Sequence, residues 1–299
     1  MSALPKICLT LFFLIRLSLV TRGETVTVYV ANIPIALPAP EGFFRCDGKS
    51  TKVDRMQQSL IGASNRLLAS FGSEDDLAQT LKDTYPKLER NFNAQSVKKF
   101  EEVSVTSAGF TDLKTTLRTS MDSTRQKLGD MFAEIESSAS STLSKDLQTR
   151  TDLKVGEMIP LGVFDETPDS ISFSMLTKYR LTAEDRGKPV EGVSIVAACA
   201  LNLRNRVINL YCTSDYRDKR DIEWARSNVK KWRDEVLAMN GATASSIPSS
   251  VPSTSYSPAR SSSLGSVVER EVSKKLVAVI VSAIFAVIAG FITLLKKRS

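Results

Sequence analysis

The sequence predicts an α+β domain, made of an antiparallel meander of four or more strands with amphipathic helices packed on one face, followed by a C-terminal transmembrane helix. Apolar residues alternate at every second position over much of residues 159–212, which is typical of strands. They recur at steps of three and four over much of residues 51–150 and again over 222–239, which is typical of helices. Residues 276–295 carry no charge at all.

The uncharged segment at residues 276–295 is followed only by three basic residues and Ser299. At about 1.5 Å per residue, a helix of this length spans roughly 30 Å, the thickness of the hydrocarbon core of a bilayer. A helix also satisfies its own backbone groups in lipid. We therefore expect residues 274–299 to form a single-pass membrane anchor with a short basic tail, so that the lipid bilayer is one partner of the chain.

Residues 1–23 have the layout of a secretory signal peptide. A basic start at Lys6 precedes an apolar run over residues 7–20, and small residues follow the run. Arg16 interrupts the run, and the alternatives are a buried N-terminal helix or a misassigned start codon. With an export signal, residues 24–240 would form a soluble domain outside the cytoplasm, and the basic tail would stay inside.

The net charge of +7 belongs to the two ends of the chain. Residues 1–23 hold three basic groups and no acid, and residues 241–299 hold seven basic and two acidic groups. The middle of the chain has 30 basic and 31 acidic residues. Because the excess positive charge lies beside the predicted lipid-contacting segments, it indicates anionic headgroups as partners and not nucleic acid.

Histidine is absent from the chain. Its absence excludes Ser-His-Asp and Cys-His catalysis and every zinc site that uses histidine. We expect no cofactor and no bound metal. The chain also has no Asn-x-Ser/Thr sequon, which favours a bacterial envelope over a glycosylating secretory pathway.

The first element predicted in the domain is a half-buried strand over residues 25–37. Val26, Val28 and Val30 alternate with polar residues, and the phase then slips near Asn32. Pro34 places part of this strand at a sheet edge or at a bulge.

The region that follows is predicted to be mainly helical. One helix, over residues 77–92, contains Pro86, which indicates a kink or two shorter helices. Ser73 is placed to cap it. A short strand is predicted over residues 102–106, and residues 111–148 are expected to form one long amphipathic helix whose weak point is its serine-rich patch.

Four consecutive antiparallel strands are predicted next. Residues 159–163 and 171–181 form a hairpin, because the sequence Asp-Glu-Thr-Pro-Asp-Ser at residues 165–170 has turn chemistry. A third strand covers residues 193–203, and a fourth follows it directly after a reversal of the chain.

The last two of these strands have a predicted register. A reversal at Arg204 and Asn205 sets three pairs of apolar residues opposite each other: Leu201 with Ile208, Cys199 with Leu210, and Ala197 with Cys212. The apolar positions of both strands then share one face, as a half-buried sheet requires.

A final helix is predicted to begin after Asp218, with Asp221 placed as in a capping box. Its apolar residues form one stripe, which includes Trp232 and which we expect to bury against the meander. Trp224 falls off this stripe, so we predict that it contacts a partner or packs under a neighbouring loop. Capping and the helix dipole explain the acidic residues at the start of the helix, and a cation site is not needed.

Residues 241–273 are predicted to be a disordered stalk that leads into a juxtamembrane segment. Residues 241–266 consist mostly of Ser, Thr and Pro and have too little apolar content to fold. A flexible chain of this length would hold the domain about 25 to 30 Å from the membrane.

Three cysteines remain after Cys8 of the predicted signal segment. Cys199 and Cys212 lie diagonally on one predicted sheet face and are the candidates for a disulfide. A disulfide from Cys46 to either of them is a second possibility, and the third is that all three cysteines are buried free thiols. No Cys-x-x-Cys pair is present, so a redox or metal-binding role has no motif behind it.

Nucleophilic catalysis without histidine would need a Ser/Lys pair. Ser-x-x-Lys occurs at Ser96 and Lys99 and again at Ser227 and Lys230. Such pairs are expected by chance in a chain of this composition, and the companion motifs of Ser/Lys hydrolases are absent. We therefore expect the protein not to be an enzyme.

The order of elements along the domain is informative. An extended segment runs into Pro-Ala-Pro-Glu-Gly-Phe at residues 38–43, then come helices, a meander, and a closing helix with Asp-Ile-Glu-Trp-Ala at residues 221–225 and Trp232 beyond it. In this order, residues 25–240 resemble the Mog1/PsbP-type α/β domains of exported bacterial proteins. The resemblance implies binding and assembly in place of catalysis, and it assigns no functional residue.

These observations predict a non-catalytic binding or assembly module of the cell envelope. We expect it to be anchored in the bacterial inner membrane, with its domain in the periplasm and an envelope protein as its partner. Two alternatives stay open at this point: a cytosolic tail-anchored protein, which has the same C-terminal anchor, and a Ser/Lys-type hydrolase.

Overall fold

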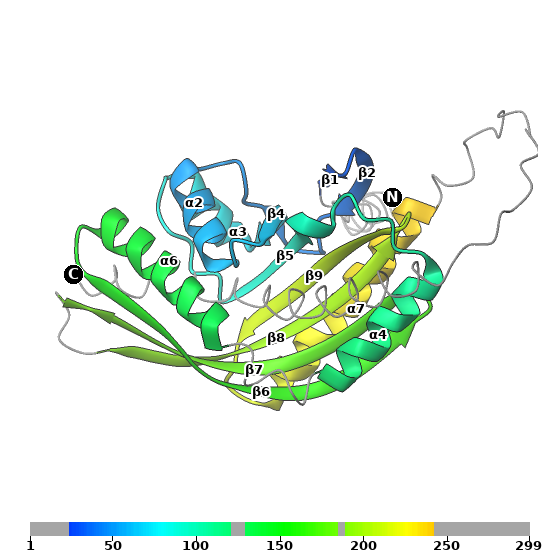
Figure 1. The fold of residues 1–299 in the computed structure, drawn as a ribbon. Coiled ribbons are helices and arrows are strands. Elements are labelled where there is room, and N and C mark those ends of the chain that lie inside the picture. The colour runs from blue at the N-terminus through cyan, green and yellow to red at the C-terminus, as the bar shows by residue number, and fades with distance from the viewer. Residues whose placement is uncertain (1–23, 121–128, 185–188, 242–299) are drawn as a thin grey trace, which may run out of the picture.

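A computed structural model describes residues 24–120, 129–184 and 189–241 of the chain. The predicted signal peptide and anchor, and the stalk beyond Gly241, lie outside these residues. Within them, no helix has the length and apolar character needed to cross a membrane. The described residues form a curved antiparallel sheet with helices on both faces (Figure 1).

Seven of the described strands form the main sheet, in the order β3-β4-β5-β9-β8-β7-β6. Their bounds are β3 (Phe44–Arg45), β4 (Asn65–Gly72), β5 (Arg90–Val97), β6 (Thr151–Thr167), β7 (Ser170–Ala183), β8 (Val190–Leu203) and β9 (Arg206–Asp215). The α+β class and the antiparallel meander β6 to β9 are therefore confirmed, and the sheet is larger than the four strands that the sequence defined.

The helices lie on both faces of this sheet. Their bounds are α2 (Thr51–Leu60), α3 (Glu74–Leu81), the 3₁₀ turn η2 (Lys98–Phe100), α4 (Ser107–Ser120), α6 (Gly129–Leu147) and α7 (Lys219–Gly241). Helix α7 covers one face, which we call the α7 face, and α2, α4 and α6 lie on the other, the α6 face (Figure 1). The prediction of helices on one face only is wrong, because the central strands are buried on both faces.

The core on the α7 face is centred on Trp232, which is 1% exposed. Its ring meets Phe71 of β4 and Phe92 of β5 edge to face, at centroid distances of 5.7 and 5.5 Å. The indole N–H donates to the carbonyl of Pro38 in β2, at 2.8 Å. The predicted apolar stripe of α7 is therefore confirmed as core from Ala225 to Val236, whereas Met239 at its end is exposed, and Trp232 connects the stripe to three strands.

The first predicted strand is in fact a hairpin, β1 (Thr25–Val30) and β2 (Ile33–Pro38). Ala31 and Asn32 between them have φ of 48° and 65°, the left-handed values of a tight hairpin turn. The change in the phase of the apolar alternation near Asn32 therefore marks the turn of this hairpin. The predicted reversal at Arg204 and Asn205 has the same backbone form, with φ of 51° and 63°.

The register predicted for the last two strands is confirmed. Leu201 pairs with Ile208, Cys199 with Leu210, and Ala197 with Cys212. The predicted hairpin before them is confirmed as β6 and β7, although both strands run further than expected and the turn narrows to Pro168 and Asp169.

Residues 51–150 are mainly helical, as predicted, but strands β4 and β5 interrupt the helices. Helix α3 starts after Ser73, as expected, but ends at Leu81, and Pro86 lies in the loop that follows. Phe92, predicted on this helix, belongs to β5 and faces α7. The strand period of β5 is hard to see in the sequence because Asn91, Asn93 and Gln95, which alternate with its apolar residues, are polar and yet buried.

Two further expectations between residues 98 and 148 need correction. Residues 102–106 form a loop and not a strand, with one backbone bond from Val105 N to Asn205 O at 2.9 Å. The serine-rich patch 137–142 does not weaken its helix, since α6 runs unbroken through it. Residues 121–128 of the predicted long helix lie outside the described residues.

The serine-rich patch has a structural role, because α6 lies along the edge strand β6. Three side chains at steps of four on α6 accept hydrogen bonds from alternate backbone N–H groups of β6: Glu136 from Val155 (2.7 Å), Ser140 from Leu153 (2.8 Å) and Ser144 from Thr151 (2.8 Å). An edge strand leaves these donors without a neighbouring strand. Acceptors four residues apart on α6 therefore match N–H groups two residues apart on β6, and the polar side chains of α6 complete the sheet edge.

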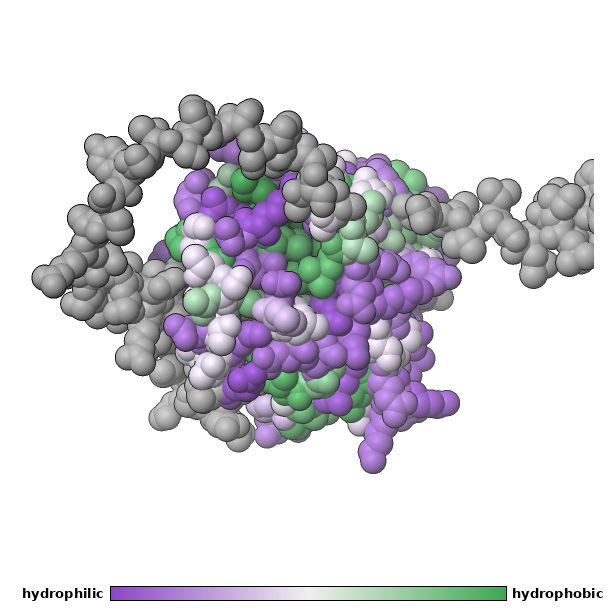
Figure 2. Space-filling model, turned by 90° about the vertical axis from the view of Figure 1, so that its right-hand side faces the viewer, coloured by the Kyte–Doolittle hydropathy of each residue, from purple (hydrophilic) through white to green (hydrophobic). Residues whose placement is uncertain are grey.

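The face of the domain shown in Figure 2 is mainly polar, and its hydrophobic residues form separate patches. Among the described residues, the large apolar side chains that are exposed belong to five different elements: Tyr29, Phe44, Leu81, Ile159 and Met239. Single exposed apolar side chains are normal for a folded domain.

We expect Ser140→Ala to lower the free energy of unfolding by about 1 kcal/mol, because the N–H of Leu153 loses its acceptor. Ser141→Ala is the matched control, since Ser141 is exposed on the same helix and alanine is the better helix former. Urea unfolding of the full chain measures both. Equal effects of the two substitutions would show that the edge contact contributes nothing.

Candidate functional site

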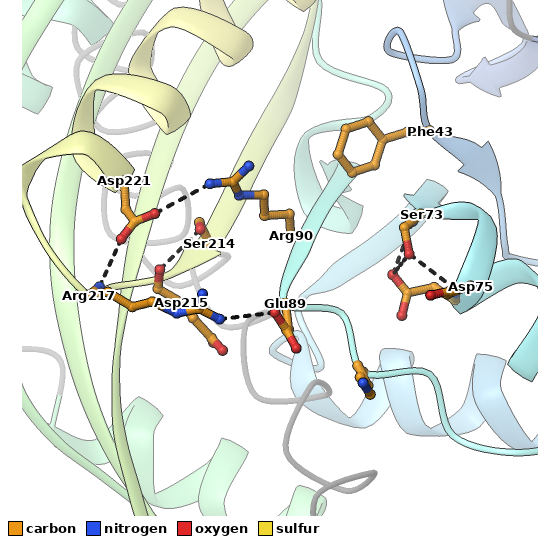
Figure 3. A pocket seen from close by; sticks show the side chains of 11 residues that line it. Phe43, Ser73, Asp75, Glu89, Arg90, Ser214, Asp215, Arg217 and Asp221 are labelled. Carbon is orange, nitrogen blue, oxygen red and sulfur yellow. Dashed lines mark hydrogen bonds and ion pairs between the residues drawn. The ribbon is translucent and has the colours of Figure 1, made fainter.

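The described residues form a pocket where β5 begins and β9 ends, beside the first turns of α3 and α7 (Figure 3). Its volume is about 440 Å³. Eleven mostly polar residues line it: Phe43, Ser73, Asp75, Asp76, Lys87, Glu89, Arg90, Ser214, Asp215, Arg217 and Asp221. We call it the β5–β9 pocket.

Antiparallel pairing of β5 and β9 brings the two halves of the pocket together. Arg90 pairs with Ser214, and the N–H of Asp215 donates to the carbonyl of Glu89 at 2.9 Å. Residues 89–90 and 214–215 therefore meet although they are far apart in the sequence.

The beginning of α7 supplies the next wall. The carboxylate of Asp221 accepts from the backbone N–H of Arg217 (2.8 Å) and of Asp218 (3.2 Å), and Asp218 accepts from the N–H of Arg220 (2.8 Å). The predicted start of this helix after Asp218 is thus confirmed, with the acidic residues used as helix caps. A guanidinium nitrogen of Arg90 lies 3.5 Å from Asp221, which ties β5 to this cap.

The beginning of α3 forms the opposite wall through a capping box. Ser73 accepts from the N–H of Asp76, and the Asp76 carboxylate accepts from Ser73 N–H at 3.0 Å. Asp76 also accepts from the N–H of Leu88 at 2.9 Å and is 3% exposed. Its oxygens are therefore occupied, whereas Asp75 beside it is exposed at the pocket.

Trp224 lies behind the pocket and is not part of its lining. The guanidinium of Arg90 sits 4.4 Å above the Trp224 ring, and Phe92 packs against the ring at 5.9 Å. The side chain is half-buried on the α7 face. Its predicted contact with a partner stays a prediction, and its visible role is to hold Arg90 at the pocket wall.

Two acids of the pocket, Asp75 and Asp215, have no hydrogen bond or ion pair of their carboxylates within the described part of the chain, and Asp215 differs from the exposed Asp75 in being half-buried. Partial burial raises the pKa of Asp215 to about 6, with Glu89 as the next cause. Arg217 opposes this rise but is paired with Glu89 at 3.1 Å. An acid that titrates near neutral pH in a pocket is a candidate binding group.

The Ser/Lys pairs are not built as nucleophile and base. Ser96 is fully buried and its hydroxyl donates to Glu101, while Lys99 is exposed. On α7, Ser227 is exposed, and Lys230 is paired with Asp165 at 2.9 Å. Neither pair lies in the β5–β9 pocket.

All three cysteines of the described residues are free and buried. Cys199 and Cys212, the candidates for a disulfide, lie on adjacent strands and face the core on the α7 face as separate thiols. Burial raises the pKa of the Cys199 thiol to about 11. A thiol with a pKa this high is a small apolar side chain and not a nucleophile.

The sequence analysis predicts Trp224 as a contact, explains Asp221 by capping, and does not predict the pocket residues Phe43, Glu89, Arg90 and Asp215. Glu89 and Arg90 reach the pocket through β5, where the sequence predicts a helix. One signal was present: in residues 90–97, Phe and Ala alternate with Asn and Gln, which is a strand period with polar residues on one side.

Comparison of the chain with protein-family models, with curated proteins and with solved structures finds no match. Within residues 24–120, 129–184 and 189–241, no group of three or more acidic or thiol side chains is placed to hold a metal ion. Inference about the pocket therefore rests on its own geometry and charge.

The raised pKa of Asp215 predicts a pH effect on stability with a definite sign. Between about pH 4 and 6 the folded state keeps a proton that the unfolded state has lost, so the free energy of unfolding falls as the pH rises. Asp215→Asn should remove this fall and gain about 1 to 2 kcal/mol at pH 7, after allowance for solvent screening. Urea unfolding at pH 4 to 7 tests this.

Asp218→Asn is the control for that titration. Hydrogen bonds from Arg220 lower the pKa of Asp218 to about 2, so its titration falls outside this pH range in the folded state. If both substitutions change the pH slope alike, Asp215 is not the titrating group.

Proposed function

We propose that the chain is a single-pass membrane protein of the bacterial envelope whose α+β domain faces the periplasm and binds a partner protein without catalysis. The observation that carries the proposal is the uncharged segment 276–295, preceded by a polar stalk and, at the other end of the chain, by an export signal. The β5–β9 pocket is the proposed binding site.

The position of the pocket along α7 supports this assignment. Helix α7 has 23 residues and is therefore about 35 Å long. Its first turn lines the pocket with Asp221, and its last turn leads toward the stalk. A domain held by the end of α7 would present the pocket on the side remote from its attachment.

The two ends of the domain lie together at the opposite end of α7. The Asn240 amide donates to the carbonyl of Ala36 at 2.8 Å and accepts from its N–H at 3.0 Å. Thr25, at the start of β1, lies beside Met239. A removed signal peptide and a membrane stalk would both join the domain at this end, so neither would obstruct the pocket.

The resemblance to Mog1/PsbP-type domains agrees with a binding role and stays a prediction. A cytosolic tail-anchored protein is the alternative with the same C-terminal segment. The Ser/Lys hydrolase is the weaker alternative. Ser96 is fully buried, and Lys230, which lines a shallow hollow on α7 together with Ser227, is paired with Asp165 at 2.9 Å.

Fusions to alkaline phosphatase test the location. A fusion after Asn240 should be active in a bacterial host, since the enzyme matures only outside the cytoplasm, and deletion of residues 1–23 should abolish the activity. The full chain should resist carbonate extraction, whereas a chain ending at Ser273 should be released. An inactive fusion would favour the cytosolic alternative, and release of the full chain would exclude the anchor.

A further inference from the structure

We propose that the β5–β9 pocket receives a lysine or arginine side chain of the partner protein and that Asp215 is the counter-charge. The inference rests on the proposed function and names the chemistry that its site recognises.

The lining carries more negative than positive charge, with five carboxylates against three basic groups. Two of the basic groups are already engaged: Arg217 with Glu89 at 3.1 Å, and Arg90 between Asp221 and Trp224. A pocket with this balance attracts a cation.

The carboxylates differ in how far they are engaged. Asp76 and Asp221 accept backbone N–H groups as helix caps, and Glu89 is paired with Arg217. Asp75 and Asp215 receive no donor from the described residues, but Asp75 is exposed to solvent whereas Asp215 is half-buried. A cationic ligand would supply the donor that this carboxylate lacks.

Phe43 gives the pocket a wall that fits a long basic side chain. Its ring is half-buried and is held edge to face by Phe92 at 4.7 Å. The methylene stem of a lysine or arginine packs on such a ring while its charged end reaches a carboxylate. An inorganic cation would gain nothing from this wall, and the described residues offer it no cluster of three acids.

The charges around Asp215 come from several elements. Glu89 precedes β5, Arg217 follows β9, and Asp221 begins α7. Tyr179 on β7 also lies within electrostatic reach. Lys87 lines the pocket and would oppose an incoming cation.

The test uses the full chain in nonionic detergent with acetyl-lysine amide as the probe. Nuclear magnetic resonance of the ¹⁵N-labelled chain should show saturable shifts at Ser214 and Asp215. Acetyl-norleucine amide, which has the same stem without the charge, should produce no saturable shift. Asp215→Asn should weaken binding of the lysine probe at least tenfold, and Lys87→Met should strengthen it.

Binding should also weaken roughly tenfold from pH 7 to pH 5, because Asp215 takes up a proton over this range. Asp218→Asn, at an exposed residue outside the lining, is the control and should leave the affinity unchanged. Equal binding of the norleucine probe, or an unchanged affinity of Asp215→Asn, would overturn the proposal. Methylammonium binding as tightly as the lysine probe would overturn the assignment to a side chain.

The outcome is separable from that of the proposed function. If the phosphatase fusion is active but the lysine probe does not bind, the periplasmic location stands and the proposed ligand is wrong. If the lysine probe binds but the fusion is inactive, the ligand stands and the proposed location is wrong.

Discussion

The fold depends on the burial of one face of α7 against the sheet. Ala225, Val229, Trp232 and Val236 of this helix are all 1% exposed or less. Trp232 contacts β4 and β5 with its ring and β2 with its indole N–H, so elements from both ends of the domain meet at one side chain. A buried aromatic residue of this size contributes several kcal/mol. Because α7 begins at the pocket, the same packing fixes the position of the pocket wall.

The pocket combines acids that the fold stabilises with a half-buried acid that it does not. Asp76 and Asp221 lie in the first turns of helices and accept backbone N–H groups there. Asp215, by contrast, is a carboxylate that partial burial makes harder to ionise. A residue whose surroundings work against its charge lowers stability, and such residues are common at sites that bind or react. This contrast, more than the presence of acids, distinguishes the pocket from an ordinary charged surface.

The meander, the register of β8 and β9, and the stripe of α7 could be predicted from the sequence because their apolar residues keep a strict period. Strands β4 and β5 could not be predicted, because Asn91, Asn93 and Gln95 are buried although polar residues are usually exposed. The turn at Asn32 was missed because it contains no glycine or proline. The candidate site could not be predicted, because capping alone explains the acidic residues near the start of α7, and Glu89 and Arg90 reach them only through the pairing of β5 with β9.

The contacts of α6 along β6 have a consequence for how other proteins meet this domain. A partner that adds a strand needs a regular row of unoccupied backbone donors and acceptors. At β6 the donors of residues 151, 153 and 155 already serve Ser144, Ser140 and Glu136, and three register shifts interrupt the strand. The opposite edge, β3, is two residues long. Residues 151–155 of β6 and the short strand β3 therefore offer little regular backbone to a partner that adds a strand.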